Sequence, residues 1–242
     1  IIKTLVLQTW EMIPENLPAS LIMQDRLLPR KAAFYKIHLP LNSNDIQLAT
    51  TRLKYEEHFF FQLSLLLNKK ERKINTKSVV FNNVGECFNT FYNEHLPFPL
   101  TNAQKRVIKE IRSDLKTGFQ MNRLLQGDVG SGKTIVALMV MLLAIDNGFQ
   151  AALMAPTEIL AEQHYLNLKR MLAPLGIEPE LLTGSLTKKE REAIYEKIAD
   201  GTCKIAVGTH ALIQKQVQFA NLGAVVIDEQ HRFGVRQRLA LE

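Results

Sequence analysis

Residues 127–134 read Gly-Asp-Val-Gly-Ser-Gly-Lys-Thr, an octet that restricts the fold of its surroundings more than any other segment. Its three glycines allow the backbone to curl so that N–H groups face inward. The apolar pair Leu124-Leu125 precedes it and the apolar run 135–138 follows, which predicts a strand, a loop and a helix. A loop at a helix N-terminus presents its N–H groups to an anion. The spacing G-x-x-x-x-G-K-[ST] therefore predicts a phosphate-binding loop (P-loop).

The residues of this loop suit a nucleoside triphosphate with Mg²⁺. Lys133 is expected to reach the outer phosphates, and the Thr134 hydroxyl is expected to coordinate the metal. The other six members are expected to surround the phosphates with backbone N–H groups: Gly127, Asp128, Val129, Gly130, Ser131 and Gly132. The alternative is an ordinary glycine-rich turn, which the apolar flanks disfavour.

An acidic motif lies further along the chain. Residues 224–229 read Ala-Val-Val-Ile-Asp-Glu, a short apolar run that ends in two acids. Such a run is typical of a buried parallel strand, and α/β sheets bind their ligands at the carboxyl ends of strands. Asp228 is the expected Mg²⁺ carboxylate, and Glu229 is the expected base that orients and deprotonates the attacking water. Taken alone, such a strand end could also be a solvated turn.

Between the two motifs, apolar and charged segments alternate as they do in α/β proteins. Residues 158–173 repeat apolar side chains at helical spacing, and residues 187–200 predict a second helix. Short apolar runs predict five strands: Leu124-Leu125, 150–155, 180–183, 204–207 and 224–227. At least five strands joined by right-handed crossovers predict an α/β fold with a doubly wound parallel sheet.

Three of the predicted strands end in small polar residues. These are Pro156-Thr157, Thr183-Gly184 and Thr209-His210. Helix caps and turns favour such residues, so local structure is one explanation. Contact with the phosphate backbone of a nucleic acid is the other. The spacing alone leaves both open.

Four segments together resemble superfamily 2 helicases, and among them the RecG family. They are 127–134, Ala155-Pro-Thr-Glu-Ile-Leu-Ala-Glu-Gln-His164, Gly208-Thr-His-Ala-Leu212 and Asp228-Glu-Gln-His-Arg-Phe-Gly-Val235. Transcription-repair coupling factors share the first and last patterns, but Ser131, Gln230 and the segment 38–62 fit the RecG family better. The resemblance covers about residues 96–242. It implies a RecA-like ATP-binding lobe of a DNA helicase that remodels branched double-stranded DNA, such as stalled forks and Holliday junctions.

The resemblance also implies roles for individual residues. Gln104 would recognise adenine, although Thr101 and Gln104 also form a T-x-x-Q capping box, and both roles can hold. Gln230 and His231 would couple the nucleotide state to DNA, with a buried core histidine as the alternative for His231. The positions expected to contact DNA are Pro156, Thr157, Thr183, Gly184, Thr209 and His210.

Two parts of the family's architecture have no counterpart between Ile1 and Glu242: the second RecA-like lobe with its arginine finger, and the amino-terminal wedge domain. The chain also begins with Ile rather than Met. We therefore expect a piece of a larger protein that binds ATP weakly and hydrolyses it near background, because ATP in this class lies between two lobes.

Composition agrees with a nucleic-acid partner but also fits other proteins. The net charge is +6 and the pI is near 9.3. Cys87 and Cys203 are isolated, which indicates a reducing cytosol, and no apolar run is long enough to span a membrane. We expect a cytoplasmic monomer, and the resemblance implies single-stranded-DNA-binding protein as a further partner. A non-motor P-loop protein, such as a switch or a small-molecule kinase, is the alternative class.

Residues 1–95 are expected to form a smaller, mainly helical region, with a boundary near His95–Pro99 where two prolines interrupt any helix. Residues 84–94 predict one helix and residues 45–70 another. The longer helix should have a broad covered face: Ile46, Ala49, Leu53, Phe60, Leu63 and Leu67. The basic cluster Lys69, Lys70, Arg72 and Lys73 favours a solvated helix end over DNA contact.

Overall fold

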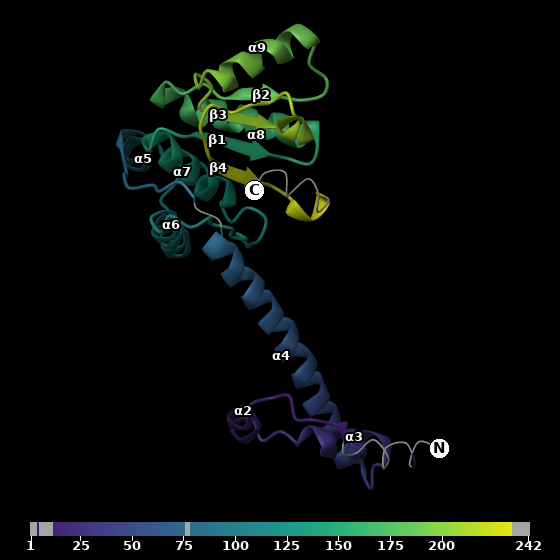
Figure 1. The fold of residues 1–242 in the computed structure, drawn as a ribbon. Helices are drawn as coiled ribbons and strands as arrows, with labels where there is room; N and C mark the ends of the chain where they lie inside the picture. The colour runs from purple at the N-terminus through teal and green to yellow at the C-terminus, as the bar shows by residue number, and fades with distance from the viewer. Residues whose placement is uncertain (1–3, 5–11, 76–77, 234–242) are drawn as a thin grey trace. The chain divides into compact units, whose positions relative to one another are not determined.

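The computed structural model describes residue 4, residues 12–75 and residues 78–233. The chain divides into two compact units, Ile1–Asn75 and Thr76–Glu242. Figure 1 draws the second unit from blue through teal and green to yellow, around a parallel sheet. This division lies before the boundary that the sequence predicts near residue 95, so residues 78–95 belong with the sheet.

The first unit consists of helices α2 (Ala19–Gln24), α3 (Arg30–His38) and α4 (Ser43–Asn75). Ala33 of α3 and Ala49 of α4 are both fully buried, and such small side chains allow two helices to approach closely. The helix predicted over 45–70 is confirmed as α4, and it is longer than expected. Coverage of its predicted face is confined to the turns around Ala49 and Leu53, because the other four residues of that face are exposed: Ile46, Phe60, Leu63 and Leu67.

The basic cluster of the sequence lies within α4 and not beyond its end. Lys70 is exposed on this helix, whereas the side chains of Lys69, Arg72 and Lys73 lie outside the described residues. The choice between a solvated helix end and DNA contact therefore stays a prediction.

Arg52 of α4 is fully buried, which the sequence pattern does not indicate. Its Nη2 lies 2.6 Å from Glu15 Oε1, and its Nη1 lies 2.7 Å from Glu56 Oε2. A buried guanidinium is tolerated when carboxylates pair with it. Burial raises the pKa of Glu15, but hydrogen bonds from the Arg30 and Leu17 backbone and from Arg52 outweigh it, so the net pKa is lowered. This ion cluster holds the segment before α2 against α4.

The second unit contains a four-stranded parallel sheet with the order β2-β3-β1-β4. Its strands are β1 (Gln150–Met154), β2 (Glu180–Leu182), β3 (Ile205–Gly208) and β4 (Leu222–Ile227). Its longer helices are α6 (Asn102–Leu115), α7 (Lys133–Asp146), α8 (Glu158–Leu172) and α9 (Lys188–Ala199). Short 3₁₀ turns complete it at η3 (Ala173–Leu175), η4 (His210–Ile213) and η5 (Gln230–Arg232).

The prediction of a strand at Leu124-Leu125 is wrong. Residues 121–128 form no strand, and Leu124 is 71% exposed. The preceding Arg123 pairs instead with two acids of α6, placing its Nε 2.5 Å from Asp114 Oδ2 and its Nη1 3.1 Å from Glu110 Oε2. The sheet therefore has four strands within the described residues, and not five.

Helices cover both faces of the sheet, as a doubly wound fold requires. On β3, Ile205 and Val207 join the large core that α7 and α8 build, whereas Ala206 joins a smaller core with Ile198 of α9. Successive strand residues point to opposite faces, so α9 lies opposite α7 and α8. The predicted α/β class and doubly wound arrangement are confirmed.

Residues 83–95 pack against the end of α7. The single helix predicted over 84–94 is an α-helix, α5 (Glu86–Thr90), that continues as a π-helical turn, η2 (Phe91–His95). Asp146, the last residue of α7, accepts backbone N–H groups from Gly85 at 2.9 Å and from Cys87 and Phe88 at 3.0 Å each. A Cβ on Gly85 would lie 2.7 Å from Asp146 Cγ, so this approach requires glycine. This carboxylate, together with Phe91 of η2 in the core that α7 builds, joins residues 83–95 to the second unit.

Asp146→Leu should lower the free energy of unfolding of the second unit by about 2–3 kcal/mol, because three backbone N–H groups lose a charged acceptor. Urea denaturation followed by circular dichroism measures this loss. Glu192→Leu is the matched control, since Glu192 is exposed and pairs loosely with Lys188 at 3.7 Å. Equal stability of the two variants would contradict the tethering role of Asp146.

Candidate active site

The phosphate-binding loop and the acidic motif lie at the same edge of the sheet. Residues 147–149 are the whole connection between α7 and β1, so α7 must run antiparallel to β1. Its 14 residues span about 21 Å, and the five residues of β1 span about 17 Å. The N-terminus of α7 is therefore carried back to the carboxyl end of β1, beside β4 (Figure 1).

The loop has the curled backbone that the sequence predicts. Gly130 and Gly132 have φ angles of 80° and 77°, a left-handed region that favours glycine. Gly132 precedes α7 without a side-chain cap, so the first N–H groups of the helix have no capping side chain. Lys133 Nζ donates to the carbonyl oxygens of Gly127 and Asp128, both at 2.8 Å, which holds the ammonium against the loop.

Gln104 connects α6 to this loop. Its backbone N–H donates to Thr101 Oγ1 at 3.2 Å, and its Oε1 accepts the Thr101 N–H at 2.8 Å, so the predicted capping box is confirmed. Its Nε2 also donates to the carbonyl oxygen of Ser131 at 2.9 Å. Any side chain at Gly132 would collide with this amide. Recognition of adenine by Gln104 stays a prediction.

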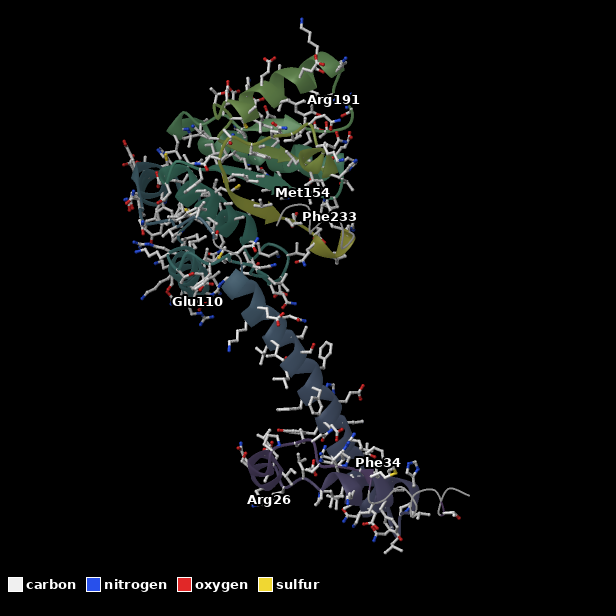
Figure 2. All side chains as sticks on the ribbon, in the orientation of Figure 1. Arg26, Phe34, Glu110, Met154, Arg191 and Phe233 are labelled. Carbon is white, nitrogen blue, oxygen red and sulfur yellow. The ribbon has the colours of Figure 1, made fainter. Side chains whose placement is uncertain are left out.

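The two acids follow β4 directly. The Asp228 N–H donates to the Met154 carbonyl at 2.9 Å, which continues the pairing of β4 with β1; Figure 2 labels Met154 at the end of β1. Asp228 Oδ1 accepts the N–H of Glu229 at 3.0 Å. Glu229 has a φ of 49°, which costs a non-glycine residue roughly 1–2 kcal/mol. Strain of this kind gathers at functional sites.

The donor groups at this edge suit Mg²⁺ bound together with phosphates. Within residues 12–75 and 78–233 no group of three or more His, Cys, Asp or Glu side chains could hold a metal ion by itself. Mg²⁺ is commonly held by one or two carboxylates, with substrate phosphates and water as its remaining ligands. Asp228 could supply such a carboxylate, and the half-buried Thr134 at the start of α7 could supply a hydroxyl. The residues present therefore fit the ion.

The predicted DNA-contacting residues all follow strands at this edge, but their exposure differs. Thr157 and Gly184 are exposed, as is His210, and Pro156 is half-buried. Thr183 and Thr209 are buried, and Thr183 Oγ1 lies 3.0 Å from Ser185 Oγ. Thr157 Oγ1 also accepts the Leu160 N–H at 3.3 Å, so helix capping accounts for part of this polar pattern.

The predicted coupling residues lie on the turn after the acids. Gln230 and His231 belong to η5 and are both exposed. The His231 side chain is 73% exposed, with its Nδ1 3.5 Å from Glu229 Oε2, so the alternative of a buried core histidine is wrong. Phe233 follows η5 and is buried; it is labelled in Figure 2. Gly234 and Val235 of the same motif lie outside the described residues.

Two side chains of α8 enter the site without having been predicted. His164 Nε2 lies 2.8 Å from Asp228 Oδ2, and Glu158 Oε1 accepts the Gly184 N–H at 2.9 Å. A signal for His164 exists in the sequence, because it lies three residues after Ala161 and four before Leu168, on the face of α8 that packs inward. A polar residue on that face needs a partner.

Both cysteines are free thiols, as their isolation in the sequence predicts. Burial raises the pKa of Cys203 to about 12, so this thiol does not ionise near neutral pH. None of the helices in the described part of the chain is long and apolar enough to cross a membrane.

Known proteins resemble this chain over most of its length. Residues 101–241 match the DEAD/DEAH box helicase family. The chain is 46% identical over 230 residues to the ATP-dependent DNA helicase RecG of Streptococcus pneumoniae, covering 95% of this chain and 34% of that protein. It is 47% identical over 234 residues to RecG of Aquifex aeolicus, covering 94% of this chain and 29% of that protein.

A solved structure described as RecG bound to a three-way DNA junction is also similar. Its TM-score is 0.79 at 44% identity, and the match covers 92% of this chain and 30% of that one. The chain spans about a third of the length of the curated relatives it matches. It belongs to the DEAD/DEAH box helicase family, and the relatives it resembles are RecG DNA helicases.

Proposed function

We propose that this chain supplies the first RecA-like, ATP-binding lobe of an ATP-dependent DNA helicase that remodels branched DNA. The observation that carries the proposal is the gathering of the P-loop, the acids after β4 and exposed strand-end residues at one edge of the sheet. A protein that couples a nucleotide to DNA needs both sets of groups on one rigid scaffold.

The nucleotide would lie over the N-terminus of α7. The backbone N–H groups of residues 127–134 and the Lys133 ammonium would hold the phosphates, and Gln104 would contact adenine. Thr134 and Asp228 would hold Mg²⁺, which neutralises charge on the phosphates. Glu229 would orient the attacking water and accept its proton.

DNA would lie along the strand ends at the same edge. Pro156, Thr157, Gly184 and His210 are the exposed or partly exposed positions that can meet a phosphate backbone, while the buried Thr183 and Thr209 shape the turns that present them. Gln230 and His231 would transmit the nucleotide state, because η5 begins immediately after Glu229.

The proposed DNA substrate, protein partner, oligomeric state and location rest on the resemblance to RecG. We propose branched double-stranded DNA as the substrate, single-stranded-DNA-binding protein as a further partner, and a monomer in the cytoplasm. The similarity over 38–62, a segment for which the coupling factors have no counterpart, favours a RecG-type motor over the motor module of a transcription-repair coupling factor.

The test is ATP hydrolysis by a full-length protein that carries this chain, measured with forked DNA, linear DNA and no DNA. Hydrolysis should be greatest with the fork. A rate that no DNA changes would instead support a non-motor P-loop protein, such as a nucleotide-dependent switch.

Two variants of the same protein should separate the roles of the acids. Glu229→Gln should still bind Mg·ATP but hydrolyse it about 10²–10⁴-fold more slowly, because the base is gone while the metal carboxylate remains. Asp228→Asn should weaken the Mg²⁺-dependent binding itself. Equal loss of Mg·ATP affinity in the two variants would contradict this division of roles.

A further inference from the structure

His164 is enclosed on the packed face of α8. Ala161 and Leu168, one turn before and after it, are fully buried. The His164 side chain is 16% exposed, and its Nε2 lies 2.8 Å from Asp228 Oδ2. An ionised carboxylate accepts hydrogen bonds and donates none, so Nε2 must carry the hydrogen in this contact. The imidazole is therefore a donor directed at the acid after β4.

The Asp228 carboxylate is held at each of its oxygens. Oδ1 accepts the Glu229 N–H at 3.0 Å, and Oδ2 meets His164. Lys133 Nζ is directed at the carbonyls of Gly127 and Asp128. Within the part of the chain that the structure describes, His164 is the side chain that pairs with Asp228. Because the Asp228 side chain is 35% exposed, the Glu229 N–H alone would hold only one of its two oxygens.

The helix that carries His164 also begins at the strand-end residues. Thr157 caps α8, and Glu158 Oε1 accepts the N–H of Gly184 at 2.9 Å. The next turns hold Ala161 and Leu168 in the core beside β3. The imidazole is thus fixed at its base by packing and presented by a rigid element, as a group that orients a metal ligand must be.

We propose that His164 is a positioning residue: it holds the Asp228 carboxylate in the orientation that binds Mg²⁺ with the nucleotide phosphates. The inference rests on the proposed function of this site. Groups that hydrogen-bond a metal-binding side chain change metal affinity by about 10–100-fold when they are removed. Loss of His164 should therefore weaken Mg²⁺ binding while leaving the P-loop and its contacts to phosphate in place.

The experiment measures binding of a fluorescent ATP analogue to a full-length protein that carries this chain, first in EDTA and then with increasing Mg²⁺. His164→Ala should raise the half-saturating Mg²⁺ concentration about tenfold and leave the affinity in EDTA unchanged. His164→Gln should recover to within about threefold of wild type, because its Nε2–H₂ can donate from a similar place. Leu166→Ala is the control, since Leu166 is exposed on the same helix.

ATP hydrolysis gives a second measure. Saturating Mg²⁺ should restore most of the hydrolysis of His164→Ala, whereas a general loss of structure would not respond to the metal. A Mg²⁺ dependence in His164→Ala equal to wild type would overturn the inference and leave the proposed function intact. A His164→Gln variant that matches His164→Ala in Mg²⁺ affinity would also overturn it. Wild-type protein that binds no Mg·nucleotide at all would instead overturn the proposed function.

Discussion

Lys133→Ala should reduce ATP hydrolysis by a full-length protein carrying this chain by roughly 10³-fold or more. An ammonium directed at the phosphoryl group contributes several kcal/mol in the transition state, and about 1.4 kcal/mol corresponds to a factor of ten in rate. Within the P-loop this is the only side-chain cation. Hydrolysis measured with forked DNA, together with binding of a fluorescent ATP analogue, gives the size of the loss.

The structure supplies a control for this substitution. Lys133 Nζ donates to two carbonyl oxygens of its own loop, and the residue is only half-buried, so the fold should survive its removal. Lys109→Ala removes an exposed lysine from α6 and should hydrolyse ATP like wild type. Near wild-type hydrolysis by Lys133→Ala would make the assignment of residues 127–134 to phosphate binding untenable.

Residues 1–242 alone should hydrolyse ATP about 10³–10⁵-fold more slowly than a full-length protein that carries them, even with DNA present. In the proposed site the acids, the P-loop and Gln104 would all approach the nucleotide from one lobe, whereas an arginine finger supplied from elsewhere typically contributes that factor. DNA binding should also be weak and fall steeply with salt, since fewer phosphates are contacted. Hydrolysis and fork binding are measured on both proteins at the same salt concentration.

Two longer versions of this chain would separate the contribution of the second lobe from that of the wedge domain. Adding a second RecA-like lobe in cis should restore hydrolysis that DNA stimulates. Adding a wedge domain alone should improve fork binding without restoring hydrolysis, because it brings no group to the phosphates. Robust DNA-stimulated turnover by residues 1–242 alone would contradict the two-lobe mechanism.

Local sequence determined much of this protein. Three glycines with a lysine and a threonine at set spacing predict the P-loop, and the observed left-handed Gly130 and Gly132 agree with it. Thr101 and Gln104 predict the capping box that begins α6. The alternation of apolar and charged segments predicts the parallel sheet. The P-loop and the capping box depend on residues that are near neighbours in the chain, and each strand of the sheet is visible as a short apolar run, so short patterns contain the required information.

Only the tertiary structure decided which contacts form between residues that lie far apart in the sequence. His164 meets Asp228 across 64 positions, and Asp146 binds backbone N–H groups about sixty positions earlier. The Leu124-Leu125 pair is an apolar run, yet the segment forms no strand, Leu124 is exposed and the neighbouring Arg123 pairs with Asp114 of α6. A local pattern shows what a segment prefers by itself, whereas burial and pairing depend on which surfaces the fold brings together. The chemistry of the loop is therefore local, and the placement of the groups that orient it is not.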